Sequence, residues 1–408
     1  MPSLMTLGMP LHGLIATACA LLMACGGADS AVPVPVQEEA ALTQEPASSP
    51  QREKAATSLA DYPLMDTLAN APVASDEARA AALTIGRGVN FGNMLDAPNE
   101  GAWDLRAEDR FIALVGNSNP AIQSVRLPVR WSNHASADTQ ATIDPVFMER
   151  VAGVVDKLLA RGVVVVLNMH HYRQLDGDTL DYGEASVPDS TDHTLVRMRF
   201  LAMWAQIAKR FSKHDARLLL EPYNEPHGLL DKQANGSRPW NDLVSRAVRV
   251  IRQTNPTRVL VIGPTHWNSA NDLEQLVLPH DPNLVLTVHA YEPFTFTHQG
   301  AEWISPKLPT GVTCCDAAQI RTITQLLDQA QTQAQGKGYP VFVGEFGAYS
   351  QAPLGSRVNY LGTMRQQMAQ RGMPWTYWEL AAGFGVYDPV QNQFRPEITQ
   401  ALYGTGNP

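Results

Sequence analysis

Hydrophobic and polar positions alternate on two length scales from about residue 76 onward. Short apolar runs, typical of strands buried on both faces, alternate with longer stretches in which apolar residues recur every three or four positions, as in amphipathic helices. The predicted strands are Gly88–Phe91, Ser124–Val129, Val163–Met169, Leu218–Tyr223, Val259–Ile262, Leu284–Val288, Val341–Gly344 and Trp375–Trp378. The predicted helices are Asp109–Val115, Pro145–Ala160, Thr194–Ser212, Asn241–Gln253, Asn271–Val277, Ala317–Gln335, Ser356–Arg371 and Pro396–Leu402.

Eight strands, each followed by a helix, predict an α/β fold of the (β/α)8 TIM barrel type, formed by a single domain over residues 76–408. The alternative is a doubly wound sheet, which usually carries a glycine-rich phosphate-binding turn after its first strand. Gly86-Arg87-Gly88 does not complete that turn, so the barrel is favoured.

The first 75 residues have a different pattern. Residues 1–24 contain an apolar stretch too short to span a membrane and are predicted to be an export signal. The sequence at its end, Leu22-Met23-Ala24-Cys25-Gly26, resembles a bacterial lipobox, which implies a lipidated Cys25; the alternative is a plain signal peptide. Residues 25–75 are rich in Ala, Pro, Glu, Gln and Ser and predict a disordered linker, in which residues 61–71 could form a short helical turn against the domain. We therefore expect an exported bacterial protein that is secreted or held at the membrane only by lipid.

Composition narrows the classes of partner. The 408 residues carry a formal net charge of −9, and 17% of them are charged against 44% hydrophobic, which suits one large core. Because the chain is acidic and has no basic block, we expect no nucleic-acid partner. We expect a monomer.

Two glutamates follow apolar runs in the same way. Glu225 lies in Asn224-Glu225-Pro226 after Leu218–Tyr223, and Glu345 follows Val341–Gly344. Proline disfavours a helical conformation in the residue before it, so Glu225 is predicted to be extended at the end of its strand. Alone, either could be a surface acid beside a turn.

Further polar and aromatic residues lie at the ends of other predicted strands. Because the carboxyl ends of barrel strands meet at one face, where barrel enzymes carry their active sites, these side chains should lie together with the two glutamates. They are Arg126, His170, His289, Tyr291 and Trp378.

This ordered set resembles glycoside hydrolase family 5, a (β/α)8 group that includes many endoglucanases. The resemblance covers residues 86–404 and rests on Arg126, His170, Asn224-Glu225-Pro226, His289-x-Tyr291, Gly344-Glu345-Phe346-Gly347 and Trp378, with similar segments at Arg87–Leu95 and Glu100–Trp103. It implies hydrolysis with retention of configuration, in which the two carboxyl groups lie about 5–5.5 Å apart.

The resemblance also implies roles for these residues. Glu225 would be the acid/base and Glu345 the nucleophile, kept ionised by Arg126 and bonded by Tyr291. His289 would bond Glu225 or the sugar, Asn224 the sugar 2-hydroxyl, and His170 another sugar hydroxyl, while Trp378 would face a pyranose ring. No cofactor is expected, and no metal, because the histidine spacing does not favour a metal site.

Several of these residues have structural alternatives. Arg126 could pair with Glu221, which lies on the same strand face as Glu225. His170 could be a buried structural histidine, and for His171 we prefer that interpretation. Aromatic side chains in the predicted loops could be sugar platforms or packing residues with equal weight: Trp103, Trp267 and Phe384.

Cys314 and Cys315 are adjacent in the loop after the sixth predicted strand. In an oxidising compartment they could form a vicinal disulfide, although adjacent residues make a strained bridge and two free thiols are the alternative.

The function expected from these residues is endo-hydrolysis of a β-1,4-linked polysaccharide, with glucan as the preferred substrate. The alternatives are mannan, xyloglucan or mixed-linkage glucan with the same mechanism, and a surface carbohydrate-binding protein without activity.

Overall fold

The computed structural model describes residues 56–66, 73–117, 120–184, 186–232 and 238–404. The predicted signal at residues 1–24, Cys25 and most of the predicted linker lie outside these residues.

Eight parallel strands form a closed barrel in which each strand pairs with the next along the chain and the last pairs with the first. This confirms the predicted TIM barrel. The strands are β1 Arg87–Asn90, β2 Ser124–Leu127, β3 Val164–Asn168, β4 Leu218–Glu221, β5 Leu260–Ile262, β6 Leu284–His289, β7 Val341–Glu345 and β8 Trp375–Tyr377. A small antiparallel pair, β9 Tyr387–Asp388 and β10 Gln393–Phe394, follows β8.

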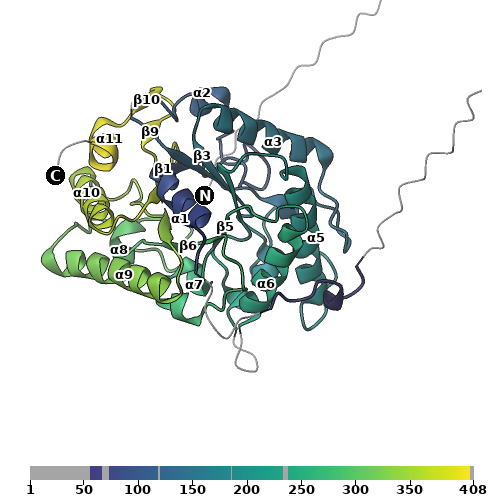
Figure 1. The fold of residues 1–408 in the computed structure, drawn as a ribbon. Helices are drawn as coiled ribbons and strands as arrows, with labels where there is room; N and C mark the ends of the chain where they lie inside the picture. The colour runs from purple at the N-terminus through teal and green to yellow at the C-terminus, as the bar shows by residue number, and fades with distance from the viewer. Residues whose placement is uncertain (1–55, 67–72, 118–119, 185, 233–237, 405–408) are drawn as a thin grey trace, which may run out of the picture. The chain divides into compact units, whose positions relative to one another are not determined.

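Helices surround the barrel (Figure 1). The long ones are α3 Pro145–Ala160, α5 Thr194–Arg210, α6 Pro239–Arg252, α9 Ala317–Gly336 and α10 Leu354–Gln370, all close to their predicted ranges. The short ones are α2 Asp109–Ile112, α4 Arg173–Asp176, α7 Thr265–Asn268, α8 Phe294–Thr297 and α11 Pro396–Tyr403, with 3-10 turns η1 Leu59–Asp61, η2 Trp131–His134, η3 Gly228–Leu230 and η4 Ala270–Gln275. A further helix, α1 Asp76–Ile85, precedes the barrel and was not predicted as a helix.

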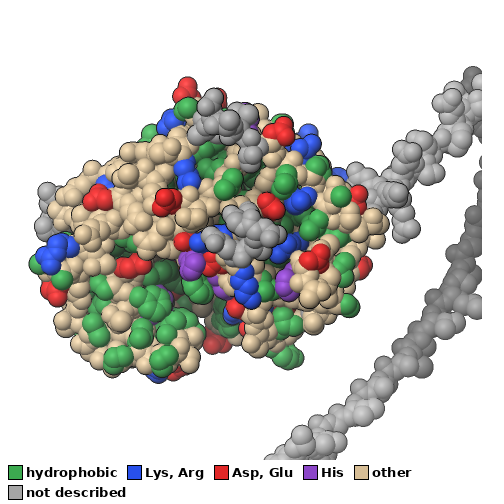
Figure 2. All heavy atoms as spheres, turned by 90° about the horizontal axis from the view of Figure 1, so that it is seen from below, with side chains coloured by type: hydrophobic (Ala, Val, Ile, Leu, Met, Phe, Trp, Pro, Cys, Tyr) green, Lys and Arg blue, Asp and Glu red, His purple; other side chains and the backbone are tan. Residues whose placement is uncertain are grey.

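Strand burial accounts for the apolar runs. Every residue of β2, β3, β4, β5, β6 and β8 is buried, as expected for parallel strands covered by helices outside and by layered side chains inside. Among the described residues, no helix is long and apolar enough to cross a membrane. On the face in Figure 2, acidic and basic side chains are interspersed.

The segment before α1 is packed rather than free. Leu59, Tyr62 and Met65 are partly buried against the core, and the Met65 amide donates to Ser245 Oγ of α6 at 3.0 Å. The packing expected for residues 61–71 is present at Tyr62 and Met65, and it begins earlier, at Leu59, within the stretch predicted as a linker.

Strand register brings the polar residues together at the carboxyl ends of the strands. Asn90 is level with Arg126, and Asn168 is level with Glu221. A register shift after Val288 sets His289 opposite Glu345 instead of Gly344. A Cβ at Gly344 would lie 2.5 Å from Thr287 Oγ1, so this close pairing of β6 and β7 requires glycine there.

Candidate active site

Glu225 and Glu345 face one another across the carboxyl end of the barrel. Glu225 follows β4 and Glu345 ends β7. One carboxylate oxygen of each lies within 4.8 Å of the other. The side chain of Glu225 is 24% exposed and that of Glu345 is 6% exposed, so Glu225 is the more accessible of the two. This upper limit on one oxygen pair is in line with the close approach of the two carboxyl groups in retaining enzymes, about 5–5.5 Å, and not with the wider separation of inverting ones.

The prediction of an extended backbone at Glu225 is wrong. Its backbone is left-handed, with φ of 51°. The following Pro226 disfavours the right-handed helical region, and the left-handed region remains accessible at a cost of about 1–3 kcal/mol. The amide of Asn224 donates to the Met169 carbonyl at 2.9 Å, and the Glu225 carbonyl is bonded by His227 Nδ1 at 2.6 Å. These two bonds hold the backbone on either side of the carboxyl group.

Arg126 is fully buried. It pairs both with Glu221, the structural alternative, and with Glu345, the functional one. It binds Glu221 in a bidentate manner, with Nε to Oε2 at 2.8 Å and a terminal nitrogen to Oε1 at 2.7 Å. Its remaining N–H groups donate to Glu345 Oε1 at 2.6 Å, Asn224 Oδ1 at 2.7 Å and Asn90 Oδ1 at 3.0 Å. Because all five donors are used, the guanidinium has a single orientation.

Glu345 receives a second donor from the loop that follows β6. The hydroxyl of Tyr291 donates to Glu345 Oε2 at 2.9 Å, so Tyr291 and Arg126 bond different oxygens of the same carboxylate. Burial raises the pKa of Glu345, whereas the charge of Arg126 and the Tyr291 hydroxyl act in the opposite direction. These donors favour the ionised form of Glu345.

Glu225 lacks a comparable pair of donors. Burial raises its pKa to about 7, although the positive charges of His227 and Arg126 oppose the shift. Two carboxyl groups in different surroundings therefore favour different protonation states, with Glu225 the more readily protonated.

His289 donates to Glu225 rather than accepting from it. Burial lowers the pKa of His289 to about 4, so its ring is neutral at pH 7. Asn268 Nδ2 lies 3.2 Å from His289 Nε2, which must then accept, and the single ring proton resides on Nδ1. Nδ1 lies 2.6 Å from Glu225 Oε1, which leaves Oε2 as the oxygen that can carry the acidic proton.

His170 and Trp378 form one wall of the site. Their rings lie parallel, with a 5° angle between planes and centroids 5.3 Å apart. Burial lowers the pKa of His170 well below its usual value, so it is a neutral hydrogen-bonding group. A Cβ at Gly92, just after β1, would lie 2.8 Å from the outer edge of the Trp378 ring, so glycine at this position lets the indole approach the chain closely.

The predicted aromatic platforms differ in exposure. Trp267 is 54% exposed and stacks on His227, and Trp103 is 36% exposed beside His171. Phe384 is consistent with the packing alternative: it is only 4% exposed, and its ring packs against Tyr291 and other aromatic residues of the adjoining loops. Trp303, in the loop after β6, is 58% exposed.

Cys314 and Cys315 form a disulfide, with an S–S distance of 1.97 Å, which is one of the two alternatives expected for this pair. Cys314 is buried and contributes to the hydrophobic core. Its carbonyl accepts from Asn359 Nδ2 of α10 at 3.4 Å, which connects this loop to the helix ring.

Glu225, His289 and Glu345 lie close enough together for a metal ion, but their oxygens and nitrogens already bond one another, Arg126, Tyr291 and Asn268. A second such group, Asp231, His266 and Asp272, surrounds the cationic Arg238. We assign no metal to either cluster, and the absence of a cofactor stays a prediction.

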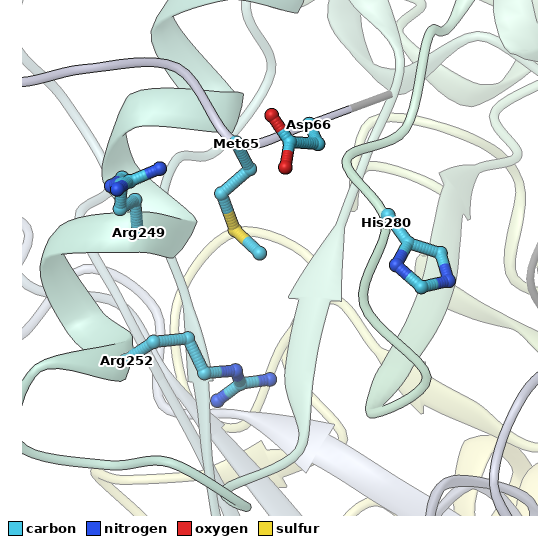
Figure 3. Close-up of a pocket in the computed structure, with 5 residues that line it drawn as sticks. All are labelled: Met65, Asp66, Arg249, Arg252 and His280. Atoms are coloured by element: carbon cyan, nitrogen blue, oxygen red, sulfur yellow. The ribbon is translucent and has the colours of Figure 1, made fainter. Parts of the chain in front are cut away.

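A cavity of about 250 Å³ lies elsewhere (Figure 3), lined by Met65, Asp66, Arg249, Arg252 and His280. Arg249 and Arg252 are at the end of α6 and His280 precedes β6, so the cavity lies where the strands begin. It is at the opposite end of the barrel from the two glutamates.

Sequence reasoning missed three polar residues of the site. Asn90 holds Arg126, Asn268 fixes the His289 ring, and His227 bonds the Glu225 backbone. Asn90 and His227 had a usable signal, because each lies at or just beyond the carboxyl end of a strand. Asn268 also follows a strand, β5, but its contact with His289 depends on a left-handed backbone, with φ of 56°, which the sequence does not reveal.

The family model for cellulase, glycosyl hydrolase family 5, matches residues 105–383. The chain belongs to glycoside hydrolase family 5. The match begins after β1 and ends in the loop after β8, and it includes both glutamates.

Two named endoglucanases match most of this chain. Endoglucanase H of Acetivibrio thermocellus is 32% identical over 79% of the chain, and endoglucanase B of Ruminococcus albus is 28% identical over 80%. The chain spans 33% of the length of endoglucanase H and 78% of endoglucanase B. Among solved structures, endoglucanase Cel5A of Thermotoga maritima is 34% identical with a TM-score of 0.72, covering 80% of this chain and 100% of its own.

Proposed function

We propose that this protein is an endo-β-1,4-glucanase that cleaves its substrate by double displacement with retention of configuration. The observation that carries the proposal is the pair Glu225 and Glu345, with carboxylate oxygens within 4.8 Å and with Arg126 and Tyr291 bonded to only one of them. A glycosidic oxygen needs a proton to leave, and the anomeric carbon needs a nucleophile on the opposite side.

In the first step, Glu345 attacks the anomeric carbon while Glu225 transfers its proton to the departing sugar oxygen. The C–O bond to the leaving sugar breaks, and an ester between the sugar and Glu345 forms. Arg126 and Tyr291 keep Glu345 ionised and oriented until the bond forms. Arg126 donates to Asn224 Oδ1 at 2.7 Å, so the amide nitrogen of Asn224 faces away from the guanidinium. This nitrogen can donate a hydrogen bond to the sugar 2-hydroxyl.

In the second step, Glu225 is a carboxylate and takes a proton from a water molecule. That water attacks the anomeric carbon, the ester to Glu345 breaks, and the product leaves with its original configuration. The proton that Glu225 gained restores the starting state. His289 stays neutral throughout and orients Glu225 through Nδ1.

Glucan is the proposed substrate because the named relatives are endoglucanases and because a structure of Thermotoga maritima Cel5A contains cellobiose, at 34% identity to this chain. A mannan is the second candidate, since the same protein has also been solved with mannotriose. Trp378 stacked beside His170 would face the ring of either sugar.

Product analysis on carboxymethyl cellulose and galactomannan tests the proposal. We expect the wild type to release reducing sugars as short oligosaccharides and Glu345→Ala to lose several orders of magnitude in rate. The matched control is Glu149→Ala, an exposed glutamate paired with Arg210 on the helix ring, which should keep wild-type activity. Turnover near wild type in Glu345→Ala would remove the assignment, and binding without release from either polymer would favour the carbohydrate-binding alternative.

We also propose that the chain is exported and lipid-anchored through Cys25. Leu22-Met23-Ala24-Cys25-Gly26 supports this, as does an apolar stretch too short to span a membrane. Radiolabelled palmitate should enter the wild type and not Cys25→Ala. Label in both proteins, or in neither, contradicts the anchor.

A further inference from the structure

His227 directly follows Asn224-Glu225-Pro226 but has no role in the two steps above. Its ring is mostly buried, with 16% of the side chain exposed, and it lies under the indole of Trp267, with ring centroids 4.9 Å apart and 21° between planes. The charge of this buried imidazole matters, because it lies beside the acid/base residue and would shift the pKa of Glu225.

Hydrogen-bond chemistry determines that charge. Nδ1 lies 2.6 Å from the Glu225 carbonyl oxygen, which can only accept, so Nδ1 must carry a proton. Nε2 lies 3.3 Å from Asp178 Oδ2, and Asp178 also accepts from Arg173 at 3.0 Å, as an ionised carboxylate does. Nε2 must therefore carry a proton as well. An imidazole with protons on both nitrogens is a cation.

The surroundings of the ring agree with a cation. Burial alone would lower the pKa of His227, but Asp176, the Glu225 carbonyl and Asp178 outweigh it and raise the pKa above the usual value. Asp176 Oδ1 lies 3.8 Å from Nδ1. The other charged or titratable groups facing this cluster are Arg173, bonded to Asp178 and Asp181, Tyr223, whose hydroxyl donates to Asp176, and His171, whose neutral form burial favours. Burial raises the pKa of Asp176 to about 7, while the charge of His227 opposes that shift.

We propose that His227 is a positively charged positioning residue that holds the left-handed backbone of Glu225 and sets the upper pH limit of catalysis. This inference rests on the proposed function, because it assigns the acid to Glu225. The bond to the Glu225 carbonyl counters the unfavourable backbone conformation. The charge favours the ionised form of the Glu225 carboxyl, so it keeps the pKa of Glu225 from rising as far as burial would take it.

The sign of the effect follows directly. Catalysis needs Glu225 protonated in the first step, so kcat/KM falls as pH rises through the pKa of Glu225, which is about 7. Removing the positive charge of His227 destabilises the ionised carboxylate and raises that pKa. The alkaline limb of the kcat/KM profile should then move to higher pH by about one unit.

The variants separate charge from shape. His227→Gln removes the charge and should show the shifted limb, whereas His227→Lys keeps a charge and should keep the wild-type limb even if kcat falls. The matched control is His214→Gln. The His214 imidazole also bonds a carboxylate, that of Asp156 at 2.9 Å, but His214 follows α5 at the opposite end of the barrel. An alkaline limb in His227→Gln that coincides with the wild type overturns the proposal.

A second measurement does not depend on turnover. Nitrogen-15 NMR of histidine side chains in the whole protein should show both nitrogens of His227 protonated at pH 6.5, with the signal assigned by its loss in His227→Gln. Asp178→Asn should lower the pKa of His227. A neutral ring at pH 6.5 in the wild type refutes the inference even if the enzyme is active. Conversely, an inactive wild type with a charged His227 refutes only the proposed function.

Discussion

Glu225 and Glu345 are the same side chain in two different environments. Glu345 accepts from Arg126 and Tyr291, whereas Glu225 accepts from the neutral His289, and burial takes the pKa of Glu225 to about 7. Because their surroundings push the two pKa values apart, one carboxyl group can be the acid while the other is the nucleophile at the same end of the barrel.

A substrate that needs no acid tests this division of roles. In Glu225→Ala, we expect hydrolysis of cellulose-type polymer to fall by about 10²–10⁴-fold, because an alcohol must leave unprotonated. Formation of the glycosyl-enzyme from a dinitrophenyl cellobioside should stay close to wild type, because that leaving group needs no proton. Added azide should give a β-glycosyl azide in Glu225→Ala and an α-glycosyl azide in Glu345→Ala. Equal losses on both substrates would mean that Glu225 is not the acid.

Arg126 should matter for both stability and activity. Arg126→Lys keeps the charge but cannot reproduce five N–H bonds in a fully buried site, so buried acceptors lose partners at a cost of about 2–4 kcal/mol in unfolding free energy. Denaturant unfolding measures this, and kcat should fall as well because Glu345 loses a donor. The control is Arg150→Lys, whose bidentate partner Glu100 is equivalent but whose side chain is 37% exposed, and which should cost about 1 kcal/mol or less. Similar losses in both variants would contradict the central role of Arg126.

At this scale, the sequence was informative about residue types at strand ends and silent about their conformation. Glu225, Glu345, Arg126 and Tyr291 could be predicted because their motifs follow apolar runs. The left-handed backbone of Glu225 could not, since proline excludes the helical region without choosing between the remaining ones. The choice between platform and packing for Phe384 could not be made either, because a loop position does not reveal whether a ring faces solvent or other rings.

Among the elements, the approach of the β1 and β8 ends shapes the sugar site. Gly92 follows β1, and Trp378 follows β8, with its amide donating to the Phe346 carbonyl at 2.9 Å. The absence of a side chain at Gly92 lets the indole lie between these loops and parallel to His170. The orientation of the Trp378 ring, the proposed sugar platform, therefore depends on the glycine at position 92.

Adding one methyl group at Gly92 should disturb substrate binding more than folding. In Gly92→Ala, the new Cβ would lie 2.8 Å from the Trp378 ring, so the indole must tilt or shift. We expect KM for cello-oligosaccharides to rise about tenfold, a loss of about 1.4 kcal/mol in binding, with a smaller change in kcat. Gly355→Ala on α10 is the control, because nothing lies within 4 Å of its new Cβ; it should leave KM unchanged and raise stability slightly. An unchanged KM in Gly92→Ala would exclude this role for the glycine.

Elements with a continuous apolar run or a clear helical period were predictable, and the shortest helices were mostly not. The eight strands lie within two residues of their predicted limits, because a continuous apolar run bounded by polar residues is typical of a buried parallel strand. The largest differences are at the carboxyl ends of β2 and β4, where the sequence run continues beyond the strand pairing. The helices α4, α7 and α8 have four residues each, too few for periodicity to register. The missed α1 is rich in alanine, which blurs the contrast between its buried and exposed faces.

For the whole molecule, the two ends of the barrel have different tasks. The carboxyl end holds the glutamates, while the amino end is closed by α1 and packed segments: the amide of Ala74 donates to the Gly338 carbonyl, and that of Ser75 to the Pro282 carbonyl. The segment 56–66 extends this closure along α6. Arg246 donates to the carbonyls of Leu59 and Tyr62, and Arg249 to that of Leu64.

Truncation distinguishes a stabilising segment from a passive linker. A chain that begins at residue 56 should keep the melting temperature of the full chain, because it retains the packing of Leu59, Tyr62 and Met65 against the core. A chain that begins at residue 73 still has the Ser75 cap of α1 but loses the packing of Leu59, Tyr62 and Met65, worth about 2 kcal/mol after the entropy of ordering is subtracted. Its melting temperature should fall by roughly 3–6 °C. Arg246→Ala in the full chain should reproduce part of that fall, while kcat stays unchanged in all three proteins because the glutamates lie at the other end. Equal melting temperatures for the two truncated chains would mean that residues 56–66 do not stabilise the domain and act only as a linker.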